Sequence, residues 1–594
     1  MDGLAIRVLS QDWHTRYHLA RIDKIHQPSE RELVLTLRSK SGTSRIMLSA
    51  HRSYARAHEL LTVRPANPEE PPMFCMRMRK HLEGGRIIKV RQQGYDRVLE
   101  LLIENQNEIG DTVQFVLILE IMGKHSNLIL CEAKGSEEPA RILDSVVHVT
   151  HDMSRVRQVL PGLPYTPPPA QDKMDVIHLD GKKLEEMRVH ELADKALNRA
   201  LMNKIAGLGM PTVIEVLSRT GLDRRDPSFP GLLATTIKGI FETALEHREQ
   251  ASIGLDELGR PAAAAPFHLT SFNSFKPANN LDEALDTVFH AALTHAAVSH
   301  RAGNLLRRVD NLLDHLRGKL VKLQQLQQEA QNHDDLRIRG ELLTTYGYTL
   351  QKGLTKVELP NFYDDEKPLS IELDPALTPM ENAQKYFKQS SRKKRALPIL
   401  KQELEATHGD IEYLETALVH LQDVSETNLS AIEQELVSQG FLTLLQKRKE
   451  QKGKDKKRKK ETQGPGQPDS YVSSDGFLIR VGRNNLQNDR LTLRQAQPTD
   501  FWFHVKDQPG SHVVIQTDQR PTPEQTIEEA ALLAAYFSKA RDSGNVAVDY
   551  TLIKQVWKAN GARPGHVLYE GQKTLYVTPD RTLLEPLLQK QVNS

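Results

Sequence analysis

The sequence predicts a multidomain α+β protein with a mixed α/β N-terminal domain, a helix-hairpin-helix region, a long antiparallel coiled-coil arm and a C-terminal α+β domain. Three observations carry this prediction. The chain has 594 residues, too many for one hydrophobic core. Apolar and polar residues alternate near both ends, as in half-buried strands. Through the middle, apolar residues follow heptad spacing instead, as in paired helices.

Changes in composition set the expected boundaries. A proline-rich stretch, LPGLPYTPPPAQDKMD, closes the N-terminal domain, and a block of like charge, KRKEQKGKDKKRKK, precedes the last domain. We expect the N-terminal domain at 1–175, the helix-hairpin-helix region at 176–275, the arm with an insert at its tip at 276–445, a basic disordered linker at 446–470 and the C-terminal domain at 471–594.

The N-terminal domain should be built around a pair of strands. Arg97–Ile103 and Thr112–Ile121 alternate apolar and polar residues, and a polar turn separates them. Further strands are expected at Glu32–Leu37 and Arg45–Leu48, and a helix over MFCMRMRKHLEGG should end at its two glycines.

A polar corner lies next to this strand pair. Asp96 and Arg97 lie at the start of the first strand, and Gly123, Lys124, His125, Ser126 and Asn127 follow the second. A glycine, a cation and short hydrogen-bonding side chains suit a partner that carries phosphate or ribose. The alternative is a tight turn with an ordinary surface Asp–Arg pair.

Two helical regions follow. ELADKALNRALMNKIAGLGMPTVIEVLSRTGLD predicts short helices joined by a Gly-Leu-Gly turn, which is typical of a helix-hairpin-helix that grips phosphate through its backbone, or of a simple connector. Strand character returns in SIGLDELGRPAAAAPFHLTSF. Heptad positions then recur in two long helices, at Leu306, Val309, Leu313, Leu316, Leu320 and Leu323, and at Leu397, Leu400, Leu404, Ile411, Leu414, Leu418 and Leu421.

These two helices most simply fold back on each other as an arm. About 35 residues at 1.5 Å each would reach roughly 50 Å. The segment VELPNFYDDEKPLSIELDP predicts a small strand pair at the tip. The same heptads could instead join two copies of the chain. The basic block 447–460 repels itself and should be disordered, and it contacts RNA or does nothing specific.

The C-terminal domain combines strands bounded by Asp-Gly and Pro-Gly turns with a helix expected at Glu524–Arg541. Aromatic and basic side chains between glycine turns suit an RNA-binding surface, with rings to stack bases and cations for phosphate. We expect that surface to contain Arg483, Asn484, Asn485, Trp502, His504, Lys506, Ser511 and His512. A histidine beside a serine could also be an acyl-transfer pair, although no orienting group or nucleophile elbow accompanies it.

Composition excludes several classes of function. The formal net charge is +2, so any preference for nucleic acid must come from local clusters of cations. The chain has 2 cysteines, which predicts a reduced, cytoplasmic protein without a disulfide framework. We see no export signal, membrane span, P-loop, metal-ligand spacing or convincing nucleophile, so we expect no membrane partner, no metal, no cofactor and no catalytic residue.

Several short segments of the sequence resemble motifs of the NFACT family, whose bacterial members are the RqcH proteins and whose eukaryotic members are the NEMF proteins. YDRV and EIMGKHSNLIL resemble its N-terminal domain, and GRNN, DFWFHVKDQPGSHVV, YFSKAR, VDYT and GARPG resemble its NFACT-R domain. The resemblance covers nearly the whole chain, in the family's order. It implies a quality-control factor that binds the obstructed large (50S) ribosomal subunit and supports template-free alanine tailing, while the ribosome makes the peptide bond.

The resemblance also implies partners and site residues. The partners would be 23S rRNA and ribosomal proteins of the 50S subunit, tRNA (with tRNA-Ala favoured) and a small RNA-binding tailing cofactor of the RqcP type. Asp96 and Arg97, with Asp2, would hold tRNA, because the matching Asp–Arg pair in the family is tied to tRNA recruitment. The N-terminal RNA-facing surface would be completed by Glu120, Ile121, Met122, Lys124, His125 and Asn127.

Two other classes of function stay open. Members of the family have been described as fibronectin-binding surface adhesins, although no export or wall-anchor signal is visible in this sequence. The N-terminal domain is also similar in fold to formamidopyrimidine-type DNA glycosylases, which use an N-terminal proline as nucleophile. Asp2 stands at that position, which argues against glycosylase chemistry.

Overall fold

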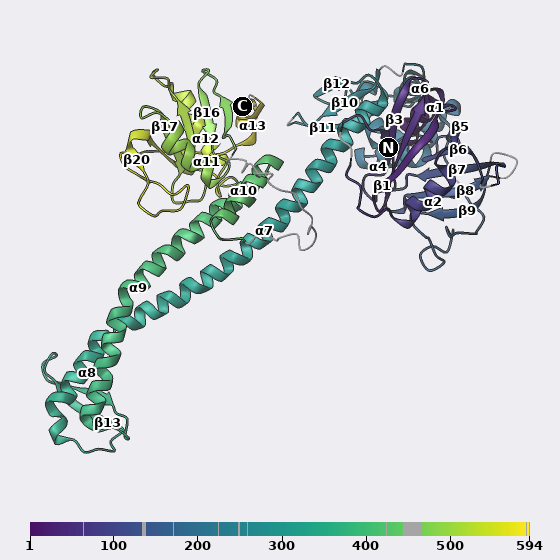
Figure 1. The fold of residues 1–594 in the computed structure, drawn as a ribbon. Helices are drawn as coiled ribbons and strands as arrows, with labels where there is room; N and C mark the ends of the chain where they lie inside the picture. The colour runs from purple at the N-terminus through teal and green to yellow at the C-terminus, as the bar shows by residue number, and fades with distance from the viewer. Residues whose placement is uncertain are drawn as a thin grey trace. The chain divides into compact units, whose positions relative to one another are not determined.

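The computed structural model describes residues 1–62, 65–107, 109–133, 138–169, 171–221, 223, 225–247, 250–257, 259–422, 424–442, 466–589 and 591–592. The chain divides into two units, Met1–Ala296 and Ala297–Ser594 (Figure 1). The basic stretch 447–460, expected to be a disordered linker, lies outside the described residues. The five-part division into domains stays a prediction.

An antiparallel sheet of 9 strands organises the first unit, in the order β4-β3-β2-β1-β5-β6-β7-β8-β9. The predicted strand pair is confirmed as β6 and β7, which pair from Val98↔Glu120 to Gln106↔Thr112. The two earlier strands predicted from the sequence are confirmed as β2 and β3. The strands are β1 (Arg21–Ser29), β2 (Glu32–Ser39), β3 (Gly42–Ser49), β4 (Arg56–Glu59), β5 (Arg86–Arg91), β6 (Val98–Gln106), β7 (Thr112–Glu120), β8 (Asn127–Ala133) and β9 (Pro139–Ser145).

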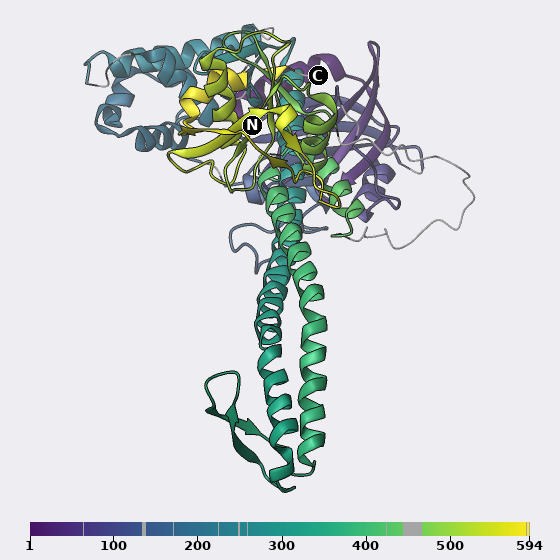
Figure 2. The same ribbon diagram turned by 90° about the vertical axis from the view of Figure 1, so that its left-hand side faces the viewer.

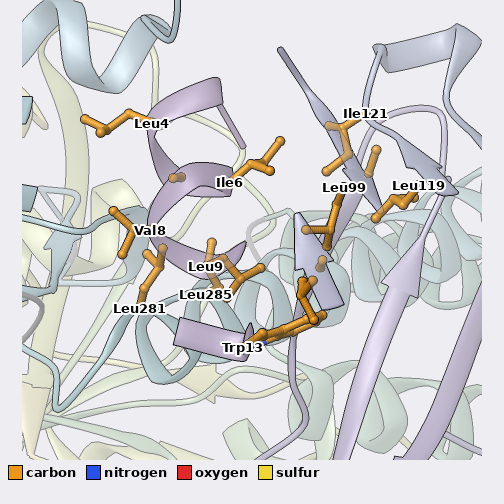
Figure 3. Packing of buried hydrophobic residues seen from close by; sticks show 14 of the residues in the cluster. Leu4, Ile6, Val8, Leu9, Trp13, Leu99, Leu119, Ile121, Leu281 and Leu285 are labelled. Atoms are coloured by element: carbon orange, nitrogen blue, oxygen red, sulfur yellow. The ribbon is translucent and has the colours of Figure 1, made fainter. Parts of the chain in front are cut away.

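Helices cover one face of this sheet. In α1 (Gly3–Tyr17), the residues at helical spacing that face inward include Leu9 and Trp13, and they pack against Leu99 and Leu119 of the sheet (Figure 3). The predicted basic helix is confirmed as α2 (Met73–Leu82), which ends just before Gly84 in the left-handed region (φ 88°).

Both cysteines are buried and free in this unit. Cys75 lies in α2 within the helix-covered core, and Cys131 lies in β8 within a second apolar cluster on the other face of the sheet. Burial raises the pKa of the Cys131 thiol to about 12, and the nearby carboxylate of Glu120 acts in the same direction.

The predicted helix-glycine-helix is confirmed as α4 (Asp194–Lys204) and α5 (Met210–Thr220). Gly207, in the connecting turn, has φ 87° and lies against the ring of Phe241, so a side chain there would be strained and crowded. Around this hairpin lie α3 (Gly181–Glu186), α6 (Phe229–Glu246) and a sheet of β10 (Ser252–Leu255), β11 (Pro261–Ala265) and β12 (Ser274–Pro277).

The predicted arm is confirmed as two long helices, α7 (Leu281–Gln331) and α9 (Pro379–His420), which run side by side in both views (Figures 1 and 2). A capping box at Thr378 and Glu381, with Pro379 in the first turn, explains where α9 begins. The heptad side chains at one end of the arm, among them Leu313 and Leu414, bury a cluster that also includes α10 (Glu426–Ser438). Farther along the arm the heptad side chains Leu320, Leu323, Leu397 and Leu400 are half-buried. Thr407, 1 % exposed, occupies the position at which the apolar heptad skips.

A small subdomain caps the arm. α8 (His333–Tyr346) packs on the predicted strand pair, β13 (Lys356–Asn361) and β14 (Lys367–Glu372), around buried Leu343 and Ile371. Tyr348, in the turn after α8, is 86 % exposed.

The C-terminal domain is a sheet of 7 strands with α12 (Glu524–Tyr536) packed on it, in the order β22-β19-β17-β18-β16-β15-β23. Its elements are β15 (Asp469–Val472), β16 (Leu478–Val481), α11 (Asn485–Arg490), η6 (Leu491–Gln495), β17 (Phe501–Val505), β18 (Val513–Gln516), β19 (Val546–Leu552), β22 (Lys573–Val577), α13 (Arg581–Gln589) and β23 (Gln591–Val592), with a separate pair of β20 (Val556–Trp557) and β21 (Leu568–Tyr569).

The helix expected at Glu524–Arg541 ends earlier, at Tyr536. The residues after it pair with a neighbouring loop instead of continuing the helix: Ser511 N donates to Phe537 O at 3.0 Å, and Lys539 N donates to Pro509 O at 2.9 Å. This tertiary pairing overrides the helical pattern of YFSKAR.

Candidate functional site

The polar corner of the N-terminal sheet brings together two segments that are far apart in the sequence. β6 starts one residue after Arg97, and β7 ends at Glu120 opposite Val98. The amide of Ile121 then donates to the carbonyl of Arg97 at 2.8 Å. Because this bond extends the ladder by one step, Asp96 and Arg97 lie beside the turn η1 (Gly123–His125).

Partly buried hydrogen bonds hold this turn. The hydroxyl of Ser126 accepts from the amide of Met122 at 2.8 Å. The side chain of Asn127 donates to Val147 O at 2.8 Å and accepts from Val147 N at 2.9 Å. Lys124 and His125 are exposed at the top of the turn, so the corner presents two basic side chains on a backbone fixed from below.

The Asp96–Arg97 pair is not a surface salt bridge. The carboxylate of Asp96 accepts from the Arg97 amide at 2.7 Å, as in an Asx-type turn. Buried Gln92 steadies the same turn, donating to Asp96 O at 2.5 Å and to Gly3 O at 2.9 Å. The Arg97 guanidinium is exposed and has no ion-pair partner among the residues that the structure describes, so it is free for an external acceptor.

Both carboxylate oxygens of Asp2 accept hydrogen bonds from other parts of the fold. It caps α1 by accepting from Ala5 N at 2.9 Å, and its other oxygen accepts from the hydroxyl of Thr212 in α5 at 2.6 Å. Gly209 faces it so closely that a Cβ there would lie 2.5 Å from the Asp2 Cβ. Asp2 therefore joins α1 to the helix-hairpin-helix, and a contact with RNA at Asp2 stays a prediction.

Lys173 joins the corner, and the sequence interpretation missed it. The neighbouring backbone pairs with the helix-hairpin-helix, since Met174 N donates to Lys204 O at 2.7 Å. Burial lowers the pKa of the Lys173 ammonium, the positive charge of Arg97 lowers it further, and Asp96 opposes both. Lys173 stands at the end of the proline-rich stretch, which we interpreted only as a domain boundary.

Three other residues predicted for the N-terminal surface lie in the interior. Glu120 accepts from the Arg157 guanidinium at 3.0 Å and from the Tyr165 hydroxyl at 3.0 Å, and Ile121 packs in the core (Figure 3). Asn127 is buried beneath the turn, and Met122 is half-buried. Any part that Glu120, Ile121 and Asn127 have in an RNA contact would therefore be indirect, through the backbone that they position.

The motif Arg483-Asn484-Asn485 of the C-terminal domain is also buried. Asn484 caps α11 by accepting from Gln487 N at 2.7 Å, and the Arg483 guanidinium lies 4.1 Å from the centroid of the Phe537 ring. Asn485 reaches the base of the arm, where it donates to the carboxylate of Glu435 in α10 at 3.1 Å.

Glu435 is the centre of that contact. Besides Asn485, the Tyr413 hydroxyl donates to it at 2.5 Å and the Leu486 amide at 3.2 Å. Burial raises the pKa of Glu435, although these three donors act in the opposite direction. The motif thus docks the domain on α9 and α10 within the unit Ala297–Ser594.

The histidines of the domain form a second buried group. His512 bonds the hydroxyl of Thr492 at 2.7 Å, and Ser511 bonds His420 of α9 at 3.3 Å. Rings of Trp502 and His512 meet edge to face, with centroids 5.3 Å apart. Burial lowers the pKa of His420 to about 3 and that of half-buried His504 to about 4. Lys506 is exposed.

The GARPG loop completes the docking contact and was not singled out residue by residue from the sequence. Arg563 donates twice to the Asp410 carboxylate, at 2.9 and 2.6 Å, and once to Gln439 O at 3.3 Å. Its guanidinium also lies 4.8 Å from the centroid of the Phe441 ring. Of the eight residues predicted to face RNA here, six are therefore buried, namely Arg483, Asn484, Asn485, Trp502, Ser511 and His512.

The described residues offer neither a metal site nor a membrane span. They contain no group of three or more histidine, cysteine, aspartate and glutamate side chains placed to hold a metal ion. Within the same residues, no helix is both long and apolar enough to cross a membrane.

Comparisons with known proteins agree with this architecture. Residues 2–459 match the family described as NFACT N-terminal and middle domains, and residues 469–576 match the NFACT protein RNA binding domain. The chain is 36 % identical over 586 residues to the Rqc2 homolog RqcH of Bacillus subtilis, covering 98 % of each chain. It is 37 % identical to the same protein of Streptococcus pneumoniae over 98 % of each chain, and 22 % identical to the archaeal Rqc2 homolog aRqcH of Methanocaldococcus jannaschii over 93 % of this chain and 83 % of that one.

Among solved structures, the C-terminal part of a fibronectin/fibrinogen-binding protein from Streptococcus suis is similar over 49 % of this chain and 98 % of that chain, with 34 % identity and a TM-score of 0.36. The family matches and the identity over nearly full length agree with the resemblance carried by YDRV, GRNN and GARPG. This chain belongs to the NFACT family, with the Rqc2 homologues named RqcH.

Proposed function

We propose that this protein is a cytoplasmic ribosome quality-control factor. In this proposal it binds the obstructed large ribosomal subunit, recruits alanyl-tRNA to the corner around Arg97, and supports the addition of alanine tails to stalled chains. The ribosome makes each peptide bond. A small RNA-binding cofactor of the RqcP type would assist the tailing step.

The free guanidinium of Arg97 is the observation that carries the proposal. The carboxylate of Asp96 accepts a hydrogen bond from the backbone amide of Arg97. It therefore orients the backbone at Arg97 without forming an ion pair with the guanidinium. Lys124, His125 and Lys173 add basic groups around the same point. A guanidinium with five donors on a fixed backbone suits a phosphate oxygen or a base edge of tRNA.

The arm supports the second half of the proposal, which is binding to a large particle. α9 has 42 residues, and at 1.5 Å per residue it spans about 60 Å. Ion pairs such as Arg317–Glu415, at 2.7 Å, join α7 to α9 outside their apolar seam. An arm of this length would let contacts at its tip and at its base lie far apart on one ribosomal subunit.

The proposal is tested by sequencing the RNA recovered with the tagged protein from cells. We expect enrichment of large-subunit rRNA and of alanine tRNA. The double variant Asp96→Ala/Arg97→Ala should lose roughly tenfold to hundredfold of the tRNA, since hydrogen bonds to a charged group contribute about 1.5–3 kcal/mol, and it should keep the rRNA. Lys173→Ala should lose a smaller part of the tRNA.

A matched control is Asp23→Ala/Arg38→Ala. This pair lies on β1 and β2 of the same sheet, with Arg38 Nε 2.6 Å from Asp23 Oδ2. It should leave both RNAs unchanged. Equal loss of tRNA in both double variants would show that the corner has no special role, and loss of rRNA together with tRNA would contradict separate sites.

The alternatives predict different results. A surface adhesin would be found on intact cells by labelling with a reagent that does not cross membranes. A nucleic-acid enzyme of glycosylase descent would nick damaged DNA. Recovery of neither rRNA nor tRNA above a mock purification would contradict the ribosomal proposal, whichever of these results followed.

A further inference from the structure

The C-terminal domain has an exposed aromatic and basic patch on the strand pair β20–β21 and on the segment beside it. Trp557 is 44 % exposed, whereas Trp13 and Trp502, the other two tryptophans of the chain, are 0 % exposed. A single exposed ring is ordinary, whereas an exposed ring beside other exposed apolar side chains and cations indicates a binding site.

The local backbone sets the direction of this side chain. Trp557 lies in β20, which pairs with β21, and Val556 beside it packs into a cluster with Leu491 and Ile553. Since successive side chains of a strand point to opposite faces, Trp557 points away from that cluster. Its cross-strand partner, Leu568, is 43 % exposed and adds apolar surface next to the indole. Figure 1 labels β20 within the C-terminal domain.

Two bonds fix the segment around Trp557 against the chain from the end of α11 to the residues before β17. Lys554 N donates to Pro498 O at 3.3 Å, and Lys558 Nζ bonds Asp489 Oδ1 at 2.6 Å. Residues 489–498 therefore run alongside residues 554–558. Arg490 and Arg494 are exposed on this neighbouring segment, while Leu491 between them is buried.

The neighbouring segment contains an unusual turn. η6 is a π-helix, in which Ala496 N donates to Leu491 O, five residues back, at 2.9 Å. Single π turns inside helical segments are rare and occur frequently at functional sites. Here the turn buries Leu491 and Thr492 and leaves Arg494 in solvent.

The cations of the patch are not neutralised by the protein. Among the residues that the structure describes, Arg490, Arg494 and Lys554 have no ion-pair partner. Nearby acids are otherwise engaged: Asp489 is paired with Lys558, and Asp500 is buried and accepts from the amide of Thr517 at 2.9 Å. Two further acids lie near β20: exposed Glu570, whose amide donates to Gln555 O, and buried Asp549, which accepts from the Tyr569 hydroxyl at 3.0 Å. Other arginines of the domain, such as Arg483 and Arg563, are paired with acids instead.

We propose that Trp557, with Arg490, Arg494 and Lys554 around it, forms a binding site for single-stranded RNA. The indole stacks on an unpaired base, and the cations bind the flanking phosphates. A protein partner would need acidic groups against three free cations, and a duplex offers no exposed base face to the ring. The proposal rests on the RNA-binding role in the proposed function and assigns that role to a face other than the buried motif around Asn485.

The chain contains its own reporter for this site. Stacking on a base quenches indole fluorescence, and Trp557 is the exposed one of the three tryptophans. We would titrate the full-length protein with a ten-nucleotide single-stranded RNA of mixed sequence. We expect quenching by this RNA, little quenching by the matching RNA duplex, and no quenching in Trp557→Phe, which keeps a ring but removes the reporter.

Affinity is measured in parallel with the same RNA carrying a fluorescent label. Trp557→Ala should weaken binding by roughly fivefold to hundredfold, because stacking contributes about 1–3 kcal/mol per base. Trp557→Phe should lose much less. In Arg490→Ala/Arg494→Ala/Lys554→Ala, the slope of log affinity against log salt concentration should become less steep by about 2. Each phosphate contact to a single strand contributes about 0.7 to this slope, and the variant lacks three cations.

Tyr576→Ala is the matched control, because Tyr576 is an aromatic residue of the same domain that is 66 % exposed on β22. It should bind RNA as the unmodified chain does. Equal thermal midpoints for all variants would show that none has unfolded. RNA binding without quenching, or equal affinity of Trp557→Ala and the unmodified chain, would overturn the proposal. Loss of self-association in Trp557→Ala, with RNA affinity unchanged, would assign the patch to protein contact and would also overturn it.

The two proposals fail separately. Asp96→Ala/Arg97→Ala should keep the quenching by the oligonucleotide, because Trp557 is not part of the corner. Quenching by a protein that recovers no ribosomal RNA from cells would keep this site and contradict the proposed function. Recovery of ribosomal RNA by a protein that shows no quenching would support the proposed function and contradict the site at Trp557.

Discussion

The corner around Arg97 and the motif around Asn485 have similar residues and opposite placements. Both place asparagine amides and a cation next to a glycine. At the corner, Asn127 and Ser126 are buried beneath a turn that exposes Lys124 and His125. At the motif, Asn485 itself is buried and donates to Glu435 of the arm. A dense run of polar residues can therefore build a surface or hold two parts of a chain together, and exposure distinguishes the two.

The two regions should differ most in the free energy of unfolding that is lost when the carboxylate of Glu435 or of Asp96 is removed. Glu435→Ala leaves the donors on Tyr413, Asn485 and Leu486 without their acceptor, and we expect a loss of about 3–5 kcal/mol in the unit Ala297–Ser594. Asp96→Ala should cost at most about 1 kcal/mol, the value of a typical hydrogen bond. Urea unfolding of the full chain measures both losses.

Glu433→Ala is the control on the same helix. Glu433 pairs with Arg301 at 2.9 Å near the surface, where such pairs contribute about 0–1 kcal/mol. If Glu435→Ala unfolded as easily as Glu433→Ala, the docking contact would not depend on Glu435.

The second prediction concerns pH. Burial lowers the pKa of His420 to about 3 and that of His512 well below its usual 6.5. The charge of Arg483 lowers the pKa of His420 further, and that of His504 lowers both pKa values. A histidine with a lowered folded-state pKa stabilises the fold above its unfolded pKa, and this stability is lost as the pH falls from about 6.5 toward the folded value. Each buried histidine should cost up to about 1.4 kcal/mol by pH 5.5.

Fluorescence-detected unfolding in a Trp13→Phe background follows this unit, because Trp502 and Trp557 then supply the signal. His420→Gln should remove about a third of the pH dependence, because burial also lowers the pKa values of His504 and His512. His408→Gln, at an exposed position of α9, should leave it unchanged. A flat stability between pH 7 and 5 would show that these histidines do not stay neutral in the fold.

The smallest effect is expected at Asp2, and it separates folding from binding. Asp2→Ala loses the cap of α1 and the bond to Thr212, and should cost about 1 kcal/mol. Asp2→Asn keeps an equivalent cap and should keep both the thermal midpoint and the recovery of tRNA. If Asp2→Asn lost tRNA at an unchanged midpoint, the carboxylate itself would contact tRNA.

Periodicity predicted the elements that depend on local pattern. Alternation identified β6 and β7, and heptad spacing identified α7 and α9, down to the skipped position that Thr407 occupies. These patterns report which face of an element is apolar.

Periodicity does not report which other element covers a polar face. Asn485 and Glu435 are 50 residues apart, and Arg563 and Asp410 are 153 residues apart. The same reason explains why Lys173 was missed, since it reaches Arg97 only through the pairing of Met174 with the helix-hairpin-helix. The early end of α12 also follows from tertiary pairing, at Ser511 and Phe537.

The two buried cysteines have a practical consequence. Maleimides and similar reagents attack thiolates that solvent can reach, and neither Cys75 nor Cys131 offers one, because both are buried and burial raises both thiol pKa values. We therefore expect the native chain to react very slowly with such reagents. A single cysteine introduced at Tyr348, on the arm's tip, could carry a fluorophore without removing any native residue of the core. Its signal would test the proposed contact of the arm with a ribosomal subunit.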